Sequence, residues 1–385
     1  MKILAICPLP PPVTGQSLAS QVFIDFLSPG NELRIINLSK QGLENGLGSW
    51  SRVREVIRIL LKVGRQKTWG DVSYFTISES SAGNLKDLLV YCLYLGRLSS
   101  LIVHLHGGAG FEKIMNKRWS FIRLINQFFL RRLGGVVVLG QIHAAIFREH
   151  VHPARLHCVA NFAQNFLFCT DMELRRKFEK ATPLRVLFLS NLIPGKGHEE
   201  LLEAYLGLDP SLQARVGIDF AGRFESDEQQ NLFLAKFGER PGLRYHGTVA
   251  GDLKKQLFVQ AHVFCLPTYY PYEGQPISIL EAYAAGCAVV TTNHSGIRDV
   301  FQPGINGYQV EKQSSCSIQQ VIDSILKNIE ALFLIGAYNR KIAGESYTVT
   351  RFTAELSGIL TGVFAKNVAD PSMGTKHRSV NSQES

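Results

Sequence analysis

Short runs of apolar and β-branched residues alternate with longer amphipathic segments along most of the chain. This alternation constrains the fold most strongly, because strands separated by helical segments pair in parallel. A first series of strands is predicted at 2–7, 33–37, 72–76, 101–104, 135–139 and 157–159. A second series is predicted at 185–189, 217–221, 243–245, 263–266 and 287–291. The sequence therefore predicts an α/β protein with two parallel sheets, each covered by helices.

A polar and charged segment at about 165–182 separates the two series of predicted strands. The chain has 385 residues, which is enough for two domains. We place an N-terminal domain at 1–170 and a C-terminal domain at 171–350. A C-terminal helix at 351–366 is expected to pack back on the N-terminal domain. The polar tail at 367–385 has no apolar period and is expected to be disordered.

Cysteine usage and hydropathy indicate the compartment. The seven cysteines are scattered, odd in number and without a Cys-x-x-Cys pair. This argues against a disulfide framework or a cysteine zinc site and favours a reducing cytosol. No uncharged apolar stretch reaches the roughly 18 residues of a membrane span. The N-terminus also lacks the plan of a signal peptide. We therefore expect a cytoplasmic protein.

The positive charge of the chain is concentrated in its first part. The net charge is +9, but residues 1–165 hold 19 Lys and Arg against 9 Asp and Glu, an excess of 10, so the remainder carries −1. An uneven distribution of this kind indicates an anionic partner for the first domain. Nucleic acid is not expected, because no recognisable nucleic-acid-binding module is present.

Two basic amphipathic stretches, 50–67 and 111–133, combine apolar faces with several Lys and Arg residues, and the second is rich in aromatic side chains. Helices of this type suit an anionic membrane surface, where each basic residue contributes roughly 1 kcal/mol. The alternative is that both simply pack on the first sheet. We expect them to make peripheral contact with an anionic membrane, at the inner face of the plasma membrane.

The segment from Tyr272 to Ala282, YEGQPISILEA, follows the predicted strand at 263–266. Pro276 suits the first turn of a helix and Gly286 suits its end, so a short helix is predicted over 276–285. The N–H groups at its start can receive an anion such as a diphosphate. Glu273 lies just before this helix and Glu281 within it, and carboxylates of this kind accept hydrogen bonds from the hydroxyls of sugars.

The spacing Glu273-x7-Glu281, with Gly286 and the turn Pro303-Gly304-x-Asn306-Gly307, resembles the donor site of glycosyltransferase family 4. Members of this family are retaining enzymes that build bacterial polysaccharides and lipopolysaccharides. The resemblance covers roughly residues 1–365. It implies the GT-B fold, in which two Rossmann-like domains face each other across a cleft.

The resemblance also implies roles for these residues. Glu273 would be a catalytic residue that contacts the donor sugar, and Glu281 would bind the ribose. The backbone after the first glutamate would complete this part of the donor site, through Gly274, Gln275, Pro276 and Ile277.

The loop after the first strand of the second series, Ser190-Asn191-Leu192-Ile193-Pro194-Gly195-Lys196-Gly197, would bind the diphosphate by the same resemblance. Lys196 matches the lysine of the family. By the resemblance it would bind the donor and would also be a catalytic residue. Asn191 stands where many members have arginine, which departs from the usual pair of cations. Arg223, after the next strand, is a candidate for the missing charge.

The loop after the first strand of the chain contains Gly15 and Gln16, where the family usually has two glycines close to the donor phosphates. Gly15 permits a close approach of the backbone, and the start of the next helix adds a favourable field. There is no Gly-x-Gly-x-x-Gly, which argues against a dinucleotide site. Gly15 and Gln16 are therefore further candidates for donor binding.

Two histidines, His104 and His106, come at the end of a predicted strand before a glycine-rich loop. Alternation places both on the same side of the sheet, with His106 nearer the strand end. By resemblance, His106 matches the active-site histidine that contacts the donor sugar. A His-x-His zinc site lacks a third ligand in the sequence.

By this resemblance, the chain is expected to be a retaining hexosyltransferase that uses a nucleotide sugar, linked to UDP or GDP, and a lipid-linked or polysaccharide acceptor. The resemblance implies that no metal is required, and no Asp-x-Asp metal motif is present. Two alternatives stay open: a GT-B enzyme that is not a transferase, such as a nucleotide-sugar epimerase, and a catalytically inactive membrane-bound scaffold.

Overall fold

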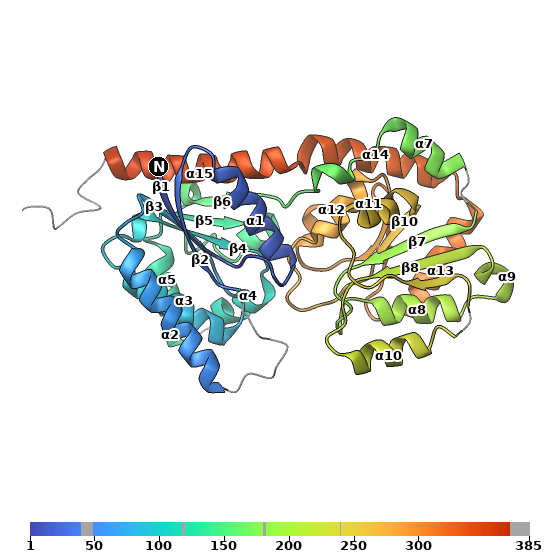
Figure 1. The fold of residues 1–385 in the computed structure, drawn as a ribbon, viewed down its shortest axis with the longest axis horizontal. Coiled ribbons are helices and arrows are strands. Elements are labelled where there is room, and N and C mark those ends of the chain that lie inside the picture. Colours follow the sequence, from blue (N-terminus) through green and yellow to red (C-terminus); the bar gives the residue numbers. More distant parts are fainter. Residues whose placement is uncertain (40–48, 118–119, 180–181, 239, 370–385) are drawn as a thin grey trace, which may run out of the picture. The chain divides into compact units, whose positions relative to one another are not determined.

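The computed structural model describes residues 1–39, 49–117, 120–179, 182–238 and 240–369. Its internal contacts divide the chain into two compact units, and Figure 1 labels the strands and helices of each. The first unit is Met1–Val159 together with the chain from Thr353 onward, and the second is Ala160–Phe352.

The first unit contains a parallel six-stranded sheet with the order β2-β1-β3-β4-β5-β6. The strands are β1 (Lys2–Cys7), β2 (Glu32–Asn37), β3 (Val72–Thr76), β4 (Leu101–Leu105), β5 (Gly135–Val138) and β6 (Leu156–Cys158). The helices are α1 (Gly15–Leu27), α2 (Ser49–Gln66), α3 (Ser81–Leu93), α4 (Ala109–Asn116), α5 (Phe121–Leu130), α6 (Gln141–Ala144) and most of α15 (Val349–Ala369).

The central strands of this sheet are buried on both faces, which explains their continuous apolar runs. On one face, Leu4 and Phe75 join a core cluster with Val63 of α2, Tyr91 of α3 and Phe129 of α5. Figure 1 shows α2, α3 and α5 side by side on this face. On the other face α1 packs against the sheet, with the rings of Phe23 and Tyr74 at 5.2 Å.

The second unit contains another parallel six-stranded sheet with the order β12-β11-β10-β7-β8-β9. The strands are β7 (Leu184–Leu189), β8 (Val216–Ala221), β9 (Leu243–Tyr245), β10 (Val263–Leu266), β11 (Ala288–Thr292) and β12 (Gly307–Val310). The helices are α7 (Asp171–Glu179), α8 (His198–Leu206), α9 (Pro210–Gln213), α10 (Asp227–Ala235), α11 (Gly251–Gln260), α12 (Ile277–Ala284), α13 (Ser315–Lys327) and α14 (Ala331–Ser346). Short 3-10 helices, of which η3 (Asn165–Leu167) and η4 (Ser295–Asp299) matter below, lie in the connections.

The two sheets confirm the predicted fold class of two Rossmann-like α/β domains. Each predicted strand is present within one residue at either end. Strand β12 was missed, because its four residues follow a glycine turn and carry little apolar signal. The order of the second sheet reverses between β7 and β10. In open α/β sheets ligands bind beyond the strand ends at such a reversal, so the loops after β7 and β10 are the first place to look for a site.

Three details differ from the predictions. The stretch 111–133 is not one helix but α4 and α5, because Lys117 adopts an extended backbone that ends α4. Residues 367–369 are helical, and the Asn367 side chain donates to the Ser99 carbonyl at 3.1 Å. The rest of the predicted tail lies outside the described residues.

The first unit ends at Val159, eleven residues before the predicted boundary at 170. The segment after Val159 bonds to the second unit instead. Ala163 donates its backbone N–H to the Tyr347 carbonyl at 2.8 Å, and Cys169 donates to the Ala284 carbonyl at 3.1 Å. At the other end, the chain returns to the first unit at Thr353, within α15.

Candidate active site

The short helix α12 runs over Ile277–Ala284, so it is one residue shorter at each end than predicted. Pro276 is its N-cap with an extended backbone rather than its first helical residue. Gly286 follows the helix with a φ of 69°, a left-handed conformation that favours glycine. The first N–H groups of a helix have no partner inside it, so the start of α12 offers donors to an anion.

Gln275 anchors the entrance to α12. Its side-chain Oε1 accepts a hydrogen bond from the Asn161 N–H at 2.6 Å, and its carbonyl accepts one from Asn161 Nδ2 at 2.7 Å. Both residues are buried. The Gln275 side chain therefore fixes the backbone of this turn through Asn161, a residue distant in sequence. The predicted donor contact of Gln275 would be made by its backbone.

Glu273 lies between β10 and α12 and is only 6% exposed. Its Oε2 accepts hydrogen bonds from Lys196 Nζ at 2.8 Å and from Thr268 Oγ1 at 2.8 Å. Its backbone carbonyl accepts one from the Ser295 hydroxyl at 2.5 Å. Because both side-chain donors use Oε2, the lone pairs of Oε1 are left for a ligand. Glu273 is thus a fixed carboxylate at the reversal point of the sheet.

Lys196 reaches Glu273 from the loop after β7. This loop is tied to the loop after β10, since the Tyr269 N–H donates to the Gly195 carbonyl at 2.7 Å. Gly197 has a φ of 90°, and a Cβ there would lie 2.5 Å from the Pro267 side chain. The ammonium of Lys196 also lies 4.8 Å from the centre of the Tyr270 ring. The structure thus brings the two predicted catalytic residues of this unit together.

Glu281, in the second turn of α12, is 1% exposed. Its Oε1 accepts a hydrogen bond from Lys254 Nζ of α11 at 2.6 Å. Burial raises the pKa of the Glu281 carboxyl, and the Lys254 ammonium opposes that rise. The same ammonium donates to Gln164 Oε1 at 3.0 Å. Glu281 is therefore a buried carboxylate with a lysine partner that the sequence did not indicate.

The two residues considered for the second cation lie on neighbouring loops. Asn191 and Arg223 are both exposed, and the N–H of Leu192 donates to the Arg223 carbonyl at 2.9 Å. The backbone thus sets Arg223 beside the loop that carries Lys196. That the Arg223 side chain binds the diphosphate stays a prediction.

In the first unit, His104 and His106 lie on the same side of β4, as alternation predicts. Their rings are 3.9 Å apart at 30°, and His104 Nδ1 is 2.7 Å from the Tyr74 hydroxyl. The buried Nε2 of His106 has no hydrogen-bond partner in the described protein. Burial lowers the pKa of His106 to about 3. Its imidazole is therefore neutral at physiological pH, with one buried nitrogen left for a ligand.

The low pKa of His106 predicts a loss of stability in acid. In the unfolded chain this imidazole takes up a proton below its ordinary pKa of 6.5, whereas the folded protein resists protonation down to about 3. The stabilisation is complete above pH 6.5 and is lost as pH falls toward 3, by up to about 1.4 kcal/mol per pH unit. His106→Asn should therefore lose less thermal stability than wild type between pH 7.5 and pH 5, as calorimetry would show. Equal losses in the two proteins would contradict the burial of a neutral His106.

The loop after β4 closes around Glu79, an acidic residue after β3 that the sequence reasoning missed. A Cβ on Gly107 would lie 1.7 Å from Glu79 Oε1, and one on Gly110 would lie 2.5 Å from the Glu79 carbonyl oxygen. The Gly110 N–H also points to Glu79 Oε2 at 3.4 Å. Gly107 is therefore needed to admit the Glu79 carboxylate, and Gly110 is needed to admit the Glu79 backbone. The signal was an acidic side chain three residues after the end of a predicted strand.

Gly15 and Gln16 form the start of α1, whose N-cap is Thr14. The Thr14 hydroxyl accepts from the Ser17 N–H at 3.1 Å, and the Ser17 hydroxyl accepts from the Thr14 N–H at 2.8 Å. This capping box fixes the helix start. The candidate donor contacts of Gly15 and Gln16 stay predictions.

Other residues that sequence reasoning missed are Thr268, Lys254, Gln164 and Asn161. Thr268 lies two residues after the end of β10, so the rule that ligands gather after strand ends could have found it. Lys254 and Gln164 lie far from Glu281 in sequence and carry no local signal. Among the described residues, no three His, Cys, Asp or Glu side chains are grouped in a way that could hold a metal ion.

Residues 171–341 match the model of the family described as "Glycosyl transferases group 1". An uncharacterized glycosyltransferase of Methanocaldococcus jannaschii is 29% identical over 143 residues, or 37% of this chain and 36% of that protein. A GDP-mannose-dependent alpha-(1-6)-phosphatidylinositol monomannoside mannosyltransferase of Mycobacterium tuberculosis is 26% identical over 198 residues, or 49% of this chain and 50% of that protein. The chain thus spans about a third to a half of the length of these relatives.

Among solved structures, Anabaena Alr3699/HepE in complex with UDP-glucose matches with a TM-score of 0.69 at 15% identity, covering 94% of this chain and 100% of that one. This likeness and the two sheets define the class of the protein as a GT-B fold. The predicted resemblance to glycosyltransferases is also confirmed. Residues 171–341, which make up less than half of the chain, are similar to the group 1 glycosyltransferases.

Proposed function

We propose that the protein is a retaining glycosyltransferase that moves a hexose from a nucleotide sugar to a lipid-linked or polysaccharide acceptor in cell-surface glycan synthesis. The observation that carries this proposal is the ion pair between Lys196 and the buried Glu273, which lies in the loop that leads into α12. A cation, helix N–H groups and a carboxylate meet at the reversal point of the second sheet. That combination suits a ligand with both phosphates and hydroxyls.

The donor would lie along this part of the second unit. The start of α12 and Lys196 would hold the diphosphate, Glu273 would bind the hexose, and Glu281 would bind the ribose. The similar mannosyltransferase of Mycobacterium tuberculosis is GDP-mannose-dependent, and the Anabaena protein of similar fold was solved with UDP-glucose, which supports a donor linked to GDP or UDP. The mannosyltransferase also has a lipid acceptor in its name, which supports the acceptor class.

In the proposed reaction an oxygen of the acceptor hydroxyl forms a bond to the anomeric carbon as the bond from that carbon to the diphosphate oxygen breaks. The proton of the hydroxyl passes to the leaving diphosphate, so no protein nucleophile is needed. The contribution of the protein is to position the two substrates and to stabilise the charge that develops on the diphosphate. His106 would contact the donor sugar, and metal-independent transfer stays a prediction.

A donor panel tests this function. The purified chain is incubated with UDP- and GDP-linked hexoses, and release of the nucleoside diphosphate is followed with and without a lipid-phosphate or glycan acceptor. Release that depends on one donor and retains the anomeric configuration is the expected result. Conversion of the donor to an epimer without release would identify an epimerase. No binding of any nucleotide would identify an inactive scaffold.

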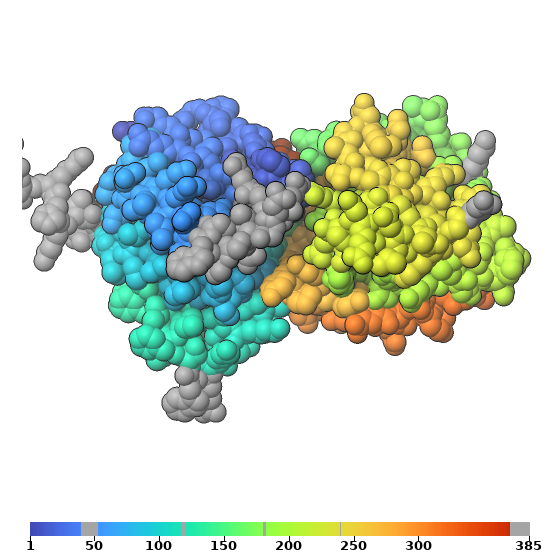
Figure 2. All heavy atoms as spheres, turned by 60° about the horizontal axis from the view of Figure 1, so that its bottom comes forward, coloured from blue at the N-terminus to red at the C-terminus, as the bar shows by residue number. Residues whose placement is uncertain are grey.

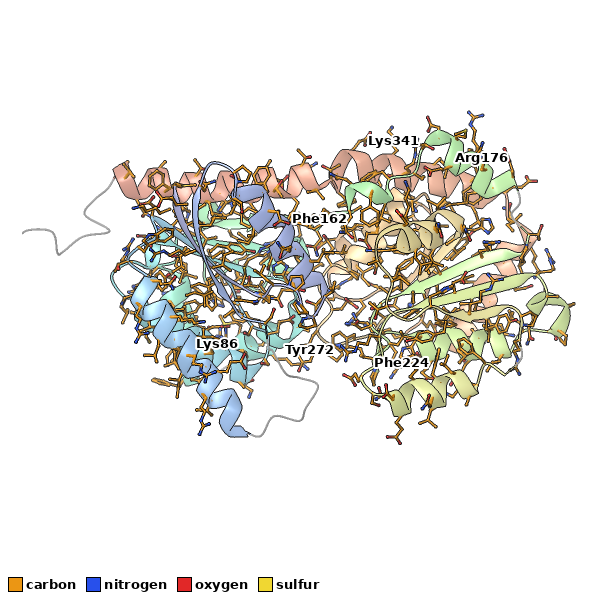
Figure 3. The ribbon with its side chains drawn as sticks, in the orientation of Figure 1. Lys86, Phe162, Arg176, Phe224, Tyr272 and Lys341 are labelled. Carbon is orange, nitrogen blue, oxygen red and sulfur yellow. The ribbon has the colours of Figure 1, made fainter. Side chains whose placement is uncertain are left out.

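The membrane contact is proposed from a surface of the first unit that we call the apolar patch. It comprises Val53, Ile57 and Leu61 of α2, Leu85 and Leu89 of α3, and Phe121, Leu124 and Phe128 of α5, all exposed. The helices α2 and α3 contact each other, as do α3 and α5. Figure 2 shows them, in blue to teal, at the surface of this unit. Lys86 of α3, labelled in Figure 3, belongs to the same group of helices.

Burial separates two faces on each of these helices. In α2, Ile59 and Val63 pack into the core, whereas Val53, Ile57 and Leu61 form a second, exposed stripe. The alternative for this stretch was that its apolar residues simply pack on the sheet. Packing on the sheet buries only some of them and leaves the second stripe exposed. Exposed basic residues lie around the stripe, namely Arg54, Arg58, Lys62 and Arg65. No helix in the described residues is long and apolar enough to cross a membrane. From the exposed stripe and its basic neighbours we propose peripheral contact with an anionic bilayer at the inner face of the plasma membrane.

Flotation with liposomes tests the patch. The wild type is expected to float with vesicles that contain phosphatidylglycerol at low salt and to be released at high salt. Phe121→Glu combined with Leu124→Glu should abolish most of this binding, because both side chains are more than 60% exposed in the patch. Leu334→Glu is the matched control, since Leu334 is 71% exposed on α14 of the second unit. Equal binding by the patch variant and wild type would contradict the proposal.

A further inference from the structure

We propose that Lys254 is a positioning residue for the nucleotide: it holds the buried Glu281 carboxylate so that one oxygen is presented to the ribose hydroxyls. This inference rests on the proposed function and adds to it a residue outside the motif. Lys254 is contributed by α11, whereas Glu281 is in α12, so the contact joins two helices.

The contacts of Lys254 are specific to side chains. Its Nζ donates to Glu281 Oε1 at 2.6 Å and to Gln164 Oε1, beside η3, at 3.0 Å. Among the described residues no other group donates to the Glu281 carboxylate. The lysine is therefore held between two fixed acceptors, and it in turn fixes the carboxylate through one oxygen. The other oxygen, Oε2, is the acceptor that remains for a ligand.

Burial makes this support necessary. Glu281 is 1% exposed, and a carboxylate removed from water loses its solvation and tends to take up a proton. A nearby ammonium favours the ionised form. An ionised carboxylate accepts hydrogen bonds through both oxygens, so Oε1 can accept from Lys254 while Oε2 accepts from the ribose, whereas a protonated carboxyl must donate through one of its oxygens. Lys254 thereby favours the ionised form of Glu281, which is the form that a ribose would need.

The first glutamate of the motif shows the same arrangement. Lys196 and Thr268 share Oε2 of Glu273, which leaves Oε1 for a ligand. Each of the two glutamates is thus bonded through one oxygen to a lysine from another element. The lysines differ in that Lys196 lies in a loop beside the start of α12, whereas Lys254 is inside a helix and is buried.

A second buried lysine in the same unit provides a comparison. Lys177 of α7 donates to the carbonyls of Phe258 at 3.1 Å and Ala285 at 2.5 Å, and to the Cys287 sulfur at 3.4 Å. Its main partners are backbone groups, so its role is to join α7 to the ends of α11 and α12. Lys177→Met is therefore a matched control that loses a buried ammonium without touching Glu281.

The test is a calorimetric titration of UDP and of GDP into the full chain. Lys254→Met is expected to raise the dissociation constant of the nucleotide that wild type binds by at least about 10-fold, and Lys254→Arg should restore most of the affinity. Lys177→Met should lower thermal stability and leave the dissociation constant within about 2-fold of wild type. In the Glu281→Gln background, Lys254→Met should add less than about 2-fold, because the carboxylate on which it acts is absent.

Two outcomes overturn the inference. One is a folded Lys254→Met protein with wild-type nucleotide affinity, and the other is the same loss of affinity with and without Glu281. If Lys254→Met is unstable, Gln164→Leu replaces it, because that change keeps the ion pair and removes only the anchor of the amine; unchanged nucleotide affinity there would likewise overturn the inference. A wild-type protein that binds neither nucleotide would contradict the proposed function itself, which separates the two failures.

Discussion

Glu273→Ala is expected to lower the rate of sugar transfer at least about 100-fold, which corresponds to about 3 kcal/mol of transition-state stabilisation. The substitution removes the carboxylate that would bind the donor hexose. It also leaves Lys196 and Thr268 without the oxygen that they share. The measurement is the turnover number with the donor that the panel identifies, at saturating concentrations of both substrates.

Two variants make this result specific. Glu273→Gln keeps the shape of the side chain and removes its charge, and it should also lose most of the activity. Glu345→Ala is the matched control, because Glu345 is a surface residue at the end of α14 whose contact with Lys341 is 3.9 Å long. A folded Glu273→Ala protein with a near-normal rate of sugar transfer would contradict the role of Glu273 in the reaction.

Gly222→Ala is expected to destabilise the second unit by at least about 3 kcal/mol. Gly222 follows β8 with a φ of 144°, and a Cβ there would lie 1.7 Å from the Ser190 carbonyl oxygen. Ser190 begins the loop that carries Lys196, so the backbone of this loop would have to move. Thermal unfolding measures the loss of stability, and nucleotide titration measures its effect on the site.

Gly247→Ala is the control, because Gly247 lies in the connection that follows β9 of the same sheet. Gly247 has a φ of 63°, but no atom lies within 4 Å of the position of its Cβ. Gly247→Ala should therefore lower the free energy of unfolding only by the cost of holding alanine in a left-handed conformation, about 1 kcal/mol. If the two alanine variants are equally stable, the close approach of the loops after β7 and β8 is wrong.

The strands other than β12 could be predicted from the sequence because each is a short, largely apolar run, and the central ones are buried in a parallel sheet. The loop position of Glu273, the helix with Glu281 and the placement of both histidines follow from local signals: a proline and a glycine at the ends of α12, and strict alternation along β4. These signals are short-range, so they place residues within an element reliably. They do not show which other side chains an element meets.

The parts that could not be predicted depend on contacts between distant segments. Asn161 holds Gln275 across 114 residues, and Lys254 holds Glu281 across 27. Lys254 lies in a polar helix whose sequence pattern gives no sign of a buried charge. Its partner Glu281 becomes evident only from the contact between α11 and α12. The break between α4 and α5 was also missed, because the apolar period continues across it.

We propose that the start of α12, with Glu273 before it and Glu281 within it, holds a nucleotide sugar. A crystal structure of the protein with its bound donor tests this most directly. We predict diphosphate oxygens within hydrogen-bond distance of the first N–H groups of α12 and of Lys196, with the hexose against Glu273 and the ribose against Glu281. A donor bound at the second unit with both glutamates out of its reach would contradict the claim.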